Sequence, residues 1–437
     1  MTQDTLTRSA RSGRWLLTYF GTSSVAETAQ AVTIMWASYR LSHNAMVTGA
    51  MNAAAYLPGV VLGLLIRKRA DNGDPAHRLS LTNWVLFAGS LLLTVVWTAG
   101  SPPAFALAAF AVVQCSLSFV KTMNKAHAGR FIRHGYTASE AIRLRQRSTS
   151  LAQVGGAVGG GAAGVLLGIG AVGWCFATAA LLYLAGLIAV RLATPSARRE
   201  AQDTAAPSET PRTSARPEKE DTPAATPSAA GNSGRQAKPA APQRDASRGS
   251  RVLRTILLYS FPSSGALPFI STVAVPLAQS VAPGSGDFYA VLSVAGMGGG
   301  FLAGTALTSK RLSSHLVLQA AFPAAAVLAA SIALFRWPAA VVLLYLVLSA
   351  VLTTHVMVMQ VLTNQAPPED QVGRFTVVRN AVAGTAKCVA ALVAGWLVEA
   401  LGLTGAWIAL AVLLGAAGVR WWSVGRTREM EELVGAH

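Results

Sequence analysis

The sequence FGTSSVAETAQAVTIMW at residues 20–36 is a run of apolar and small residues almost long enough to cross a lipid bilayer, yet Glu27 lies at its centre. Apolar runs recur along the 437-residue chain, in which 52% of residues are hydrophobic and 13% are charged. The mean hydropathy is +0.43. Because a membrane-spanning helix needs about 20 mostly apolar residues, this pattern predicts a polytopic membrane protein. The first run lacks a cleavage pattern, so we interpret it as a permanent helix.

Twelve apolar segments are long enough to span a membrane. They cover residues 15–39, 46–66, 79–99, 103–123, 149–168, 172–192, 253–280, 287–308, 314–335, 338–362, 375–399 and 404–422. Residues 194–251 separate the two sets of six and contain eight of the chain's 20 prolines, a composition that disfavours folding. We therefore expect an all-α integral membrane protein with two pseudo-symmetric six-helix bundles, residues 1–193 and 252–437, joined by a disordered cytoplasmic linker at 194–251.

Lysine and arginine are concentrated in alternate loops. The basic runs at 67–69 and 143–147 follow even-numbered segments, whereas the odd-numbered gaps carry chiefly Arg40 and Arg336. Because basic loops stay in the cytoplasm during insertion, we expect both termini to be cytoplasmic in a multi-pass protein of the inner (plasma) membrane. The net charge of +17 is thus mostly a topology signal. We expect no nucleic-acid partner, since no basic patch is interleaved with aromatic residues on a soluble domain.

Cysteine and histidine give no sign of a disulfide framework or a metal site. Cys115, Cys175 and Cys388 each lie inside a predicted span, and the histidines show no ligand spacing. We therefore expect no cofactor and no metal. His355 stands alone among aliphatic residues, which is compatible with packing or with a proton relay.

Several predicted helices carry a polar stripe. On the first, Tyr19, Ser23, Glu27, Gln30 and Thr33 follow at steps of four, four, three and three, which places them on one face. Such a face cannot contact lipid, so we expect the helices to surround a water-accessible central cavity. Our predicted lining residues, besides those of the first helix, are Asn52, Tyr56, Gln114, Ser118, Lys121, Tyr259, Thr353, His355 and Gln360.

Two buried charges lie at the same predicted depth. Glu27 is thirteen residues past Arg14, and Lys387 is thirteen residues past Arg374. At about 1.5 Å per residue, each charge should lie roughly 20 Å above the cytoplasmic end of its helix. An unpaired charge there would cost about 3 kcal/mol on insertion scales. Glu27 and Lys387 are therefore either a proton-coupling pair, in which Glu27 takes up a proton, or a static salt bridge.

A local motif and a weak repeat resemble a known family. SLSFVKTMNKA and HVMVMQVLTNQA end the fourth and tenth predicted helices, and NQAPPEDQVGRFTVVRNAVAG occupies residues 364–384. The last stretch, with Gly373 and Arg374, resembles the P-x-x-x-x-G-R loop of the major facilitator superfamily, and the chain looks most similar to its twelve-helix drug:proton antiporter branch. This resemblance implies alternating access around a site between the two halves.

The resemblance also implies gating residues, although the gate loops depart from the family pattern. The family loop Gly-x-x-x-Asp-Arg-x-Gly-Arg-Arg appears here as GLLIRKRADNGD, with Gly63 in place, Arg67 where the aspartate is expected, and Asp71 four residues late. We expect gating roles for these three residues and for Gly373 and Arg374. The fifth helix has GGAVGGGAAG at 155–164, a glycine face that lets helices approach closely, for sliding or for static packing.

These observations predict a proton-coupled secondary active exporter of a small organic compound, such as a drug or natural product. We expect small-molecule substrate, protons and lipid as partners, a monomeric state and no enzyme activity. Glu27 favours a cationic substrate, whereas Lys121 and Lys387 favour an anionic one. The alternatives are an exporter of an anionic metabolite or siderophore, and a membrane-embedded enzyme or non-transporting scaffold on the same fold.

Overall fold

The computed structural model of the chain describes residues 3–58, 60–61, 75–136, 138–205, 243–308, 313–367 and 372–424. These residues form long α-helices and turns, with no β-strand in the ranges given. The helices are α1 (Gln3–Ser42), α2 (Ala45–Ala54), α4 (Pro75–Thr98), α5 (Pro103–Gly135), α6 (Ala138–Gly168), α7 (Val172–Ala205), α8 (Gln243–Val281), α9 (Gly286–Thr308), α10 (Ser314–Leu334), α11 (Pro338–Gln365) and α12 (Val372–Val424).

The described helices fit the predicted twelve crossings. Nine of them, α4 to α12, are long and apolar enough to be candidate spans within the described residues. α12 has 53 residues and bends at Gly402, whose φ of 71° lies in the left-handed region that glycine adopts without strain. Its two arms match the predicted segments 375–399 and 404–422. α1 carries the polar stripe and α2 is only 10 residues long, so neither is among the nine.

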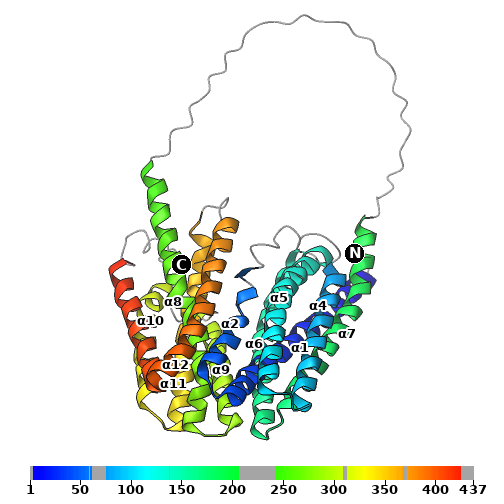
Figure 1. Cartoon of the computed structure of the whole chain (residues 1–437). Coiled ribbons are helices and arrows are strands. Elements are labelled where there is room, and N and C mark those ends of the chain that lie inside the picture. Colours follow the sequence, from blue (N-terminus) through cyan, green and yellow to red (C-terminus); the bar gives the residue numbers. More distant parts are fainter. Residues whose placement is uncertain are drawn as a thin grey trace, which may run out of the picture.

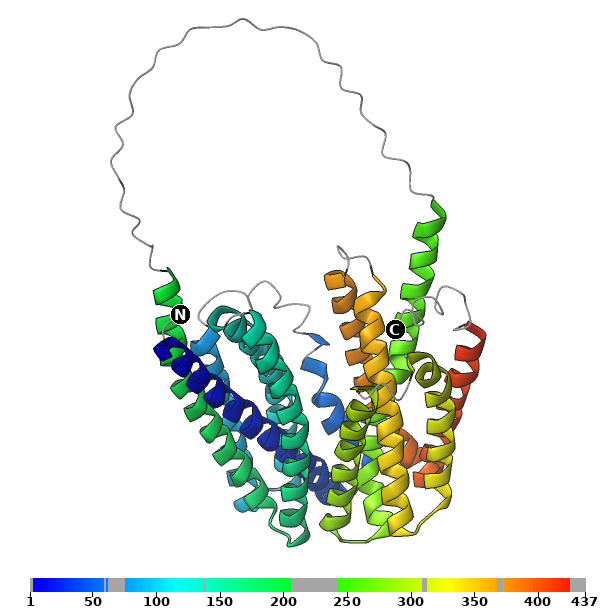
Figure 2. The same cartoon turned by 180° about the vertical axis from the view of Figure 1, so that it is seen from behind.

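The helices pack into two bundles that lie side by side (Figures 1 and 2). In the first bundle, α1 packs on α6 and α7, and α4 packs on α5 and α7. In the second, α8 and α10 pack on α12, and α11 packs on α9 and α10. The predicted linker at 194–251 overlaps the end of α7 and the start of α8, and residues 206–242 lie outside the described residues. The bundle boundaries therefore stay a prediction.

Two seams join the bundles, α2 with α12 and α6 with α9. Glycine allows backbone contact along both. A Cβ added to Gly49 would lie 2.5 Å from the carbonyl oxygen of Ala391, and one added to Gly395 would lie 2.5 Å from that of Ala45. In the other seam, a Cβ on Gly164 would overlap Ala290. Such close approach maximises dispersion contact where lipid offers no hydrophobic drive.

Polar contacts also close one end of the molecule, the end opposite to the start of α1 and the end of α12 (Figure 1). α1 begins, α7 ends, α8 begins and α12 ends at one end, which we call the terminal end (Figure 1). At the opposite end, Asn44 caps α2 by accepting hydrogen bonds from the N–H groups of Met46 and Val47. The adjacent N–H of Ala45 donates to Glu399 of α12 at 2.6 Å. A carboxylate at the positive end of a helix is favourable, so Glu399 ties the second bundle to α2 of the first.

We predict that Gly49→Ala destabilises the protein, because the added methyl group would push α2 away from α12. Overpacking of this kind costs about 1–3 kcal/mol. The measurement is thermal unfolding of the purified protein followed by tryptophan fluorescence. Gly21→Ala is the matched control, since its Cβ would have nothing within 4 Å. Equal melting temperatures for the two variants would contradict the backbone contact.

Candidate substrate cavity

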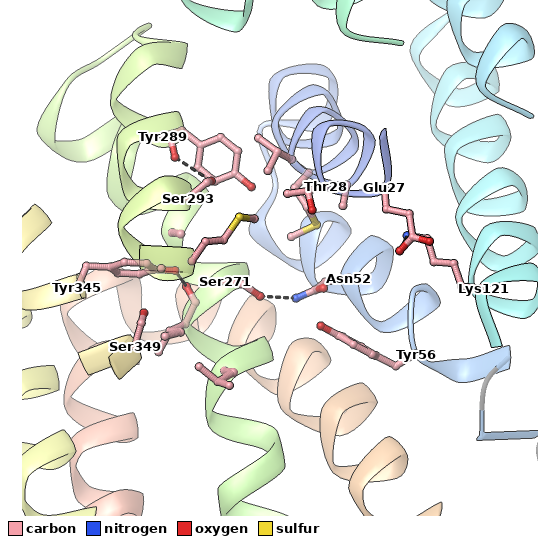
Figure 3. Close-up of a pocket in the computed structure, with 18 residues that line it drawn as sticks. Glu27, Thr28, Asn52, Tyr56, Lys121, Ser271, Tyr289, Ser293, Tyr345 and Ser349 are labelled. Atoms are coloured by element: carbon pink, nitrogen blue, oxygen red, sulfur yellow. Dashed lines mark hydrogen bonds and ion pairs between the residues drawn. The ribbon is translucent and has the colours of Figure 1, made fainter. Parts of the chain in front are cut away.

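A polar cavity lies between the two bundles and consists of two adjoining chambers. The smaller has a volume of about 480 Å³ and is lined from α1, α2, α5, α8, α9 and α11 (Figure 3). The larger has a volume of about 820 Å³ and is lined from α1, α2, α5, α8, α11 and α12. Asn52, Tyr56 and Lys121 belong to both linings. The chambers are therefore two parts of one central space of the size that small-molecule sites have.

Solvent reaches the larger chamber toward the terminal end. Gln360 near the end of α11 and Asn380 near the start of α12 line it and are exposed. At the opposite side of the cavity, Trp36 of α1 stacks on Tyr289 of α9, with ring centroids 5.7 Å apart and planes 12° apart. Tyr289 also lines the smaller chamber. The structure is thus accessible at the terminal end and sealed by aromatic, glycine and Glu399 contacts at the other.

Glu27 forms an ion pair with Lys121 of α5. The Oε2 and Nζ atoms are 3.6 Å apart, and the side chains are 31% and 25% exposed respectively (Figure 3). The predicted pairing of Glu27 with Lys387, for proton coupling or as a static salt bridge, is therefore replaced in the structure by an ion pair of Glu27 with Lys121. The depth estimate assumed a helix along the membrane normal, but α1 runs obliquely across its bundle (Figure 2), so thirteen residues rise by less.

Lys387 contacts a different partner. Its Nζ lies 5.5 Å from the ring centroid of Tyr56, in the turn that follows α2, within the range of a cation–π interaction. Both residues line the larger chamber. The contact joins α12 of the second bundle to the turn after α2 of the first, so the predicted second buried charge does lie in the cavity, although not beside Glu27.

Asn52 makes a polar link across the cavity. Its Nδ2 lies 2.9 Å from the hydroxyls of Ser271 and Thr272 and 3.1 Å from the carbonyl oxygen of Pro268, all in α8. Pro268 is one of the prolines inside α8. The amide therefore connects α2 to the proline-containing part of α8, where a helix has fewer intrahelical hydrogen bonds to hold it rigid.

Most predicted residues from α2, α5, α11 and α12 line the chambers. They are Asn52, Tyr56, Gln114, Ser118, Lys121, Gln360 and Lys387. α1 differs, since its chamber-lining residues are Glu27, Thr28, Ala31, Val32 and Met35. Glu27 lies at the boundary between this face and the polar stripe. Glu27 therefore lines the smaller chamber, whereas the other residues of the stripe do not.

The other residues of the polar stripe on α1 pack inside the first bundle and line neither chamber. Tyr19 is buried in a core cluster of that bundle. Gln30 accepts a hydrogen bond from Ser90 of α4 at 3.3 Å. Ser23 faces α7, because a Cβ added to Gly186 would lie 3.3 Å from its Oγ. Polar side chains can serve helix packing within the membrane, which a helical stripe alone does not distinguish from cavity lining.

Three further predicted residues also line neither chamber. Tyr259 packs edge-on against Trp421, with ring centroids 4.5 Å apart. The Nδ1 of His355 lies 3.1 Å from the hydroxyl of Ser263. Thr353 lies on α11 between chamber-lining turns. The contacts of His355 favour the packing alternative over the proton relay.

Sequence reasoning missed Arg379 of α12. This residue lines the larger chamber, and only 6% of its surface is exposed. It falls inside the predicted eleventh span, so the rule that marks ionisable groups in a span as functional would have found it.

The predicted gating residues are mostly beyond the structural description. Gly63, Arg67 and Asp71 lie outside the described residues. Gly373 and Arg374 lie in the first turn of α12, where their side chains are outside the description too. Their gating roles stay predictions. Within the described part of the chain, no group of three or more metal-ligating side chains occurs.

Two helical bundles around a polar cavity, accessible at one end and sealed at the other, define the architecture of a secondary transporter. The sequence profile of the Major Facilitator Superfamily matches residues 21–386, and the chain belongs to this superfamily. A search of curated protein sequences gives no significant match.

Solved transporter structures share the fold. The nucleoside transporter NupG has 11% sequence identity and a TM-score of 0.67, over 95% of this chain and 100% of that one. The inward-open xylose transporter XylE from E. coli has 12% identity and a TM-score of 0.62, over 98% and 99%. An inward-facing bacterial homologue of the iron transporter ferroportin has 14% identity and a TM-score of 0.63, over 95% and 99%. The transported solutes named for these proteins differ, so the likeness concerns the fold alone.

We predict that a double-mutant cycle of Glu27→Gln and Lys121→Gln gives a coupling energy of about 1 kcal/mol, because the pair is only partly buried and water screens it. The measurement is thermal or denaturant unfolding of the four proteins. The comparison cycle uses Glu27→Gln with Lys387→Gln and should be additive within about 0.5 kcal/mol. Stronger coupling in the comparison cycle would favour the original pairing with Lys387.

Proposed function

We propose that this protein is a proton-coupled secondary active transporter that exports a small organic compound by alternating access. The observation that carries the proposal is Glu27, the one carboxylate among the described residues that line the chambers, held against Lys121 in a solvent-accessible cavity. Ionisable groups inside membrane proteins are rare and are commonly part of proton or substrate pathways. The family membership and the two-bundle fold support transport as the activity.

The proposed coupling step is protonation of Glu27. A proton on this carboxylate removes the attraction to Lys121 and so loosens the contact between α1 and α5 at the cavity wall. A cationic substrate would compete with the proton for the same carboxylate, which gives exchange of one for the other. The two bundles would then rock about the seams α2–α12 and α6–α9, where smooth glycine contacts allow small displacements.

An anionic substrate is the second candidate, and the charges of the larger chamber favour it. Lys121, Arg379 and Lys387 line this chamber, and no acidic residue is found in the part of its lining that the structure describes. For an anion, protonation of Glu27 would increase the attraction of the cavity, because Lys121 would lose its counter-charge. Proton and anion would then bind together and move in the same direction, which is uptake and not export when the proton gradient points into the cell.

We predict that Glu27→Gln abolishes proton-coupled transport. Proteoliposomes loaded with the pH indicator pyranine receive an imposed pH gradient, with ethidium as the cationic probe and naphthoate as the anionic probe. The wild type should show substrate-dependent proton flux, opposite in direction to ethidium or in the same direction as naphthoate.

Glu140→Gln is the control for this measurement, since Glu140 lies in the first turn of α6 and lines neither chamber. Its proton flux should equal that of the wild type. Uphill, gradient-dependent transport at the normal rate in Glu27→Gln would exclude the coupling role of Glu27.

A further inference from the structure

The described part of the larger chamber's lining has an excess of positive charge. Among its described residues, Lys121, Arg379 and Lys387 are cations, and none is acidic. The charge of Lys121 is offset by Glu27 in the adjoining chamber. Lys387 lies over the face of Tyr56, which attracts a cation. Arg379 of α12 is the third cation of this lining.

Arg379 is the most deeply buried of these cations. Its side chain is 6% exposed, and its buried Nε and Nη2 atoms have no hydrogen-bond partner among the described residues. A guanidinium stays charged at any physiological pH, so it cannot relieve its burial by losing a proton. Buried charges in proteins are paired or hydrogen-bonded. The larger chamber into which Arg379 faces is thus the place where a counter-charge would be received.

The surroundings of Arg379 fit an oxyanion attached to an organic group. A guanidinium offers a planar fork of N–H donors that matches the two oxygens of a carboxylate or phosphate. The side-chain amides of Gln360 and Asn380 line the same chamber near the terminal end. Leu267 and Val356 provide apolar surface in the same wall. A small molecule with one oxyanion and an apolar or aromatic part would use both kinds of surface.

Lys387 would contribute differently. It follows Arg379 by eight residues on α12, which is about 12 Å along the helix axis. It therefore does not share one oxyanion with Arg379 but raises the potential deeper in the chamber. An organic cation is disfavoured here, because the aromatic face of Tyr56 that could bind it already holds the Lys387 ammonium.

We propose that Arg379 is the anchor of an anion-binding subsite in the larger chamber, which holds the carboxylate or phosphate of a small organic solute by paired hydrogen bonds. Lys387 attracts the same solute over a longer distance. This inference rests on the proposed transport function in its anionic form and names the substrate class that the cavity takes.

The test measures binding of three matched probes to the purified full-length protein in detergent, by thermal shift and tryptophan fluorescence. Naphthoate and naphthyl phosphate carry the oxyanions, and naphthylmethylamine carries a positive charge on the same ring system. Both anions should stabilise the wild type saturably at concentrations up to about 10 mM, a range that detects dissociation constants near 1 mM. The amine should not stabilise it.

The Arg379 variants distinguish the contribution of the bidentate guanidinium geometry from the contribution of its positive charge. Arg379→Gln should weaken anion binding about tenfold or more, because a charge-assisted hydrogen-bonding group is lost. Arg379→Lys keeps the charge without the fork, so it should bind naphthyl phosphate better than naphthoate. Lys387→Gln should have a smaller effect than Arg379→Gln. Arg336→Gln is the matched control, since Arg336 bonds to Thr404 and lines neither chamber.

Three results would overturn the subsite: no binding of either anion, stronger binding of the amine, or unchanged anion binding in both Arg379 variants. Monodisperse elution and a cooperative melt show that each variant is folded. A different result would contradict the proposed transport function without contradicting the subsite. Anion binding that depends on Arg379, without any proton flux in proteoliposomes, would remove proton coupling and leave the subsite intact.

Discussion

The arrangement of this protein depends on the high cost of leaving charged groups in the low-dielectric interior of a membrane without partners or water. Glu27 lies on α1, whereas Lys121, Arg379 and Lys387 lie in candidate membrane spans of α5 and α12, and all four line the space between the two bundles. The ion pair of Glu27 with Lys121 and the contact of Lys387 with Tyr56 reduce that cost. Arg379 lines the cavity, where a counter-charge can reach it. A polar centre between two apolar bundles is therefore the consequence of where these four charges fall.

At the end opposite to the terminal end, the two bundles are held together by contacts that can separate without a large free-energy cost. Glycine-mediated backbone contacts in the α2–α12 and α6–α9 seams rely on dispersion. Glu399 binds the N-terminus of α2 through one hydrogen bond. On separation, the carboxylate and the N–H group would both be exposed to water at the membrane surface. Such an interface can form at one end and break at the other without desolvating a new charge.

The fold was predictable because the hydropathy of a segment indicates directly whether that segment lies in lipid or in water. The sequence indicated twelve spans, and even the bend at Gly402 lies between two predicted segments. The polar lining from α2 and α5 was also largely predictable, since amides and lysines in a span have few other places to lie. The face of α1 that lines the cavity was not predictable from the sequence. Tyr19 and Gln30 serve packing within the bundle, and only the three-dimensional arrangement distinguishes this role from cavity lining.

The ion-pair partner of Glu27 was missed for a related reason. Depth along a sequence equals depth in the membrane only for a helix along the membrane normal, and α1 is oblique (Figure 2). Arg379 was overlooked although its position inside a predicted span is the signal that marks such groups. The gate loop at 63–74 departs from the family pattern in sequence, and it lies outside the described residues.

The central claim is that the two bundles alternate access to this cavity. The most direct measurement is double electron–electron resonance on protein whose three cysteines are replaced, with spin labels across each end. Exposed positions Arg147 and Val361 report on the terminal end, and Ala104 and Phe335 report on the opposite end. When proton and solute conditions change, the account predicts that one distance shortens while the other lengthens. Distances that change together, or that never change at either end, would contradict it.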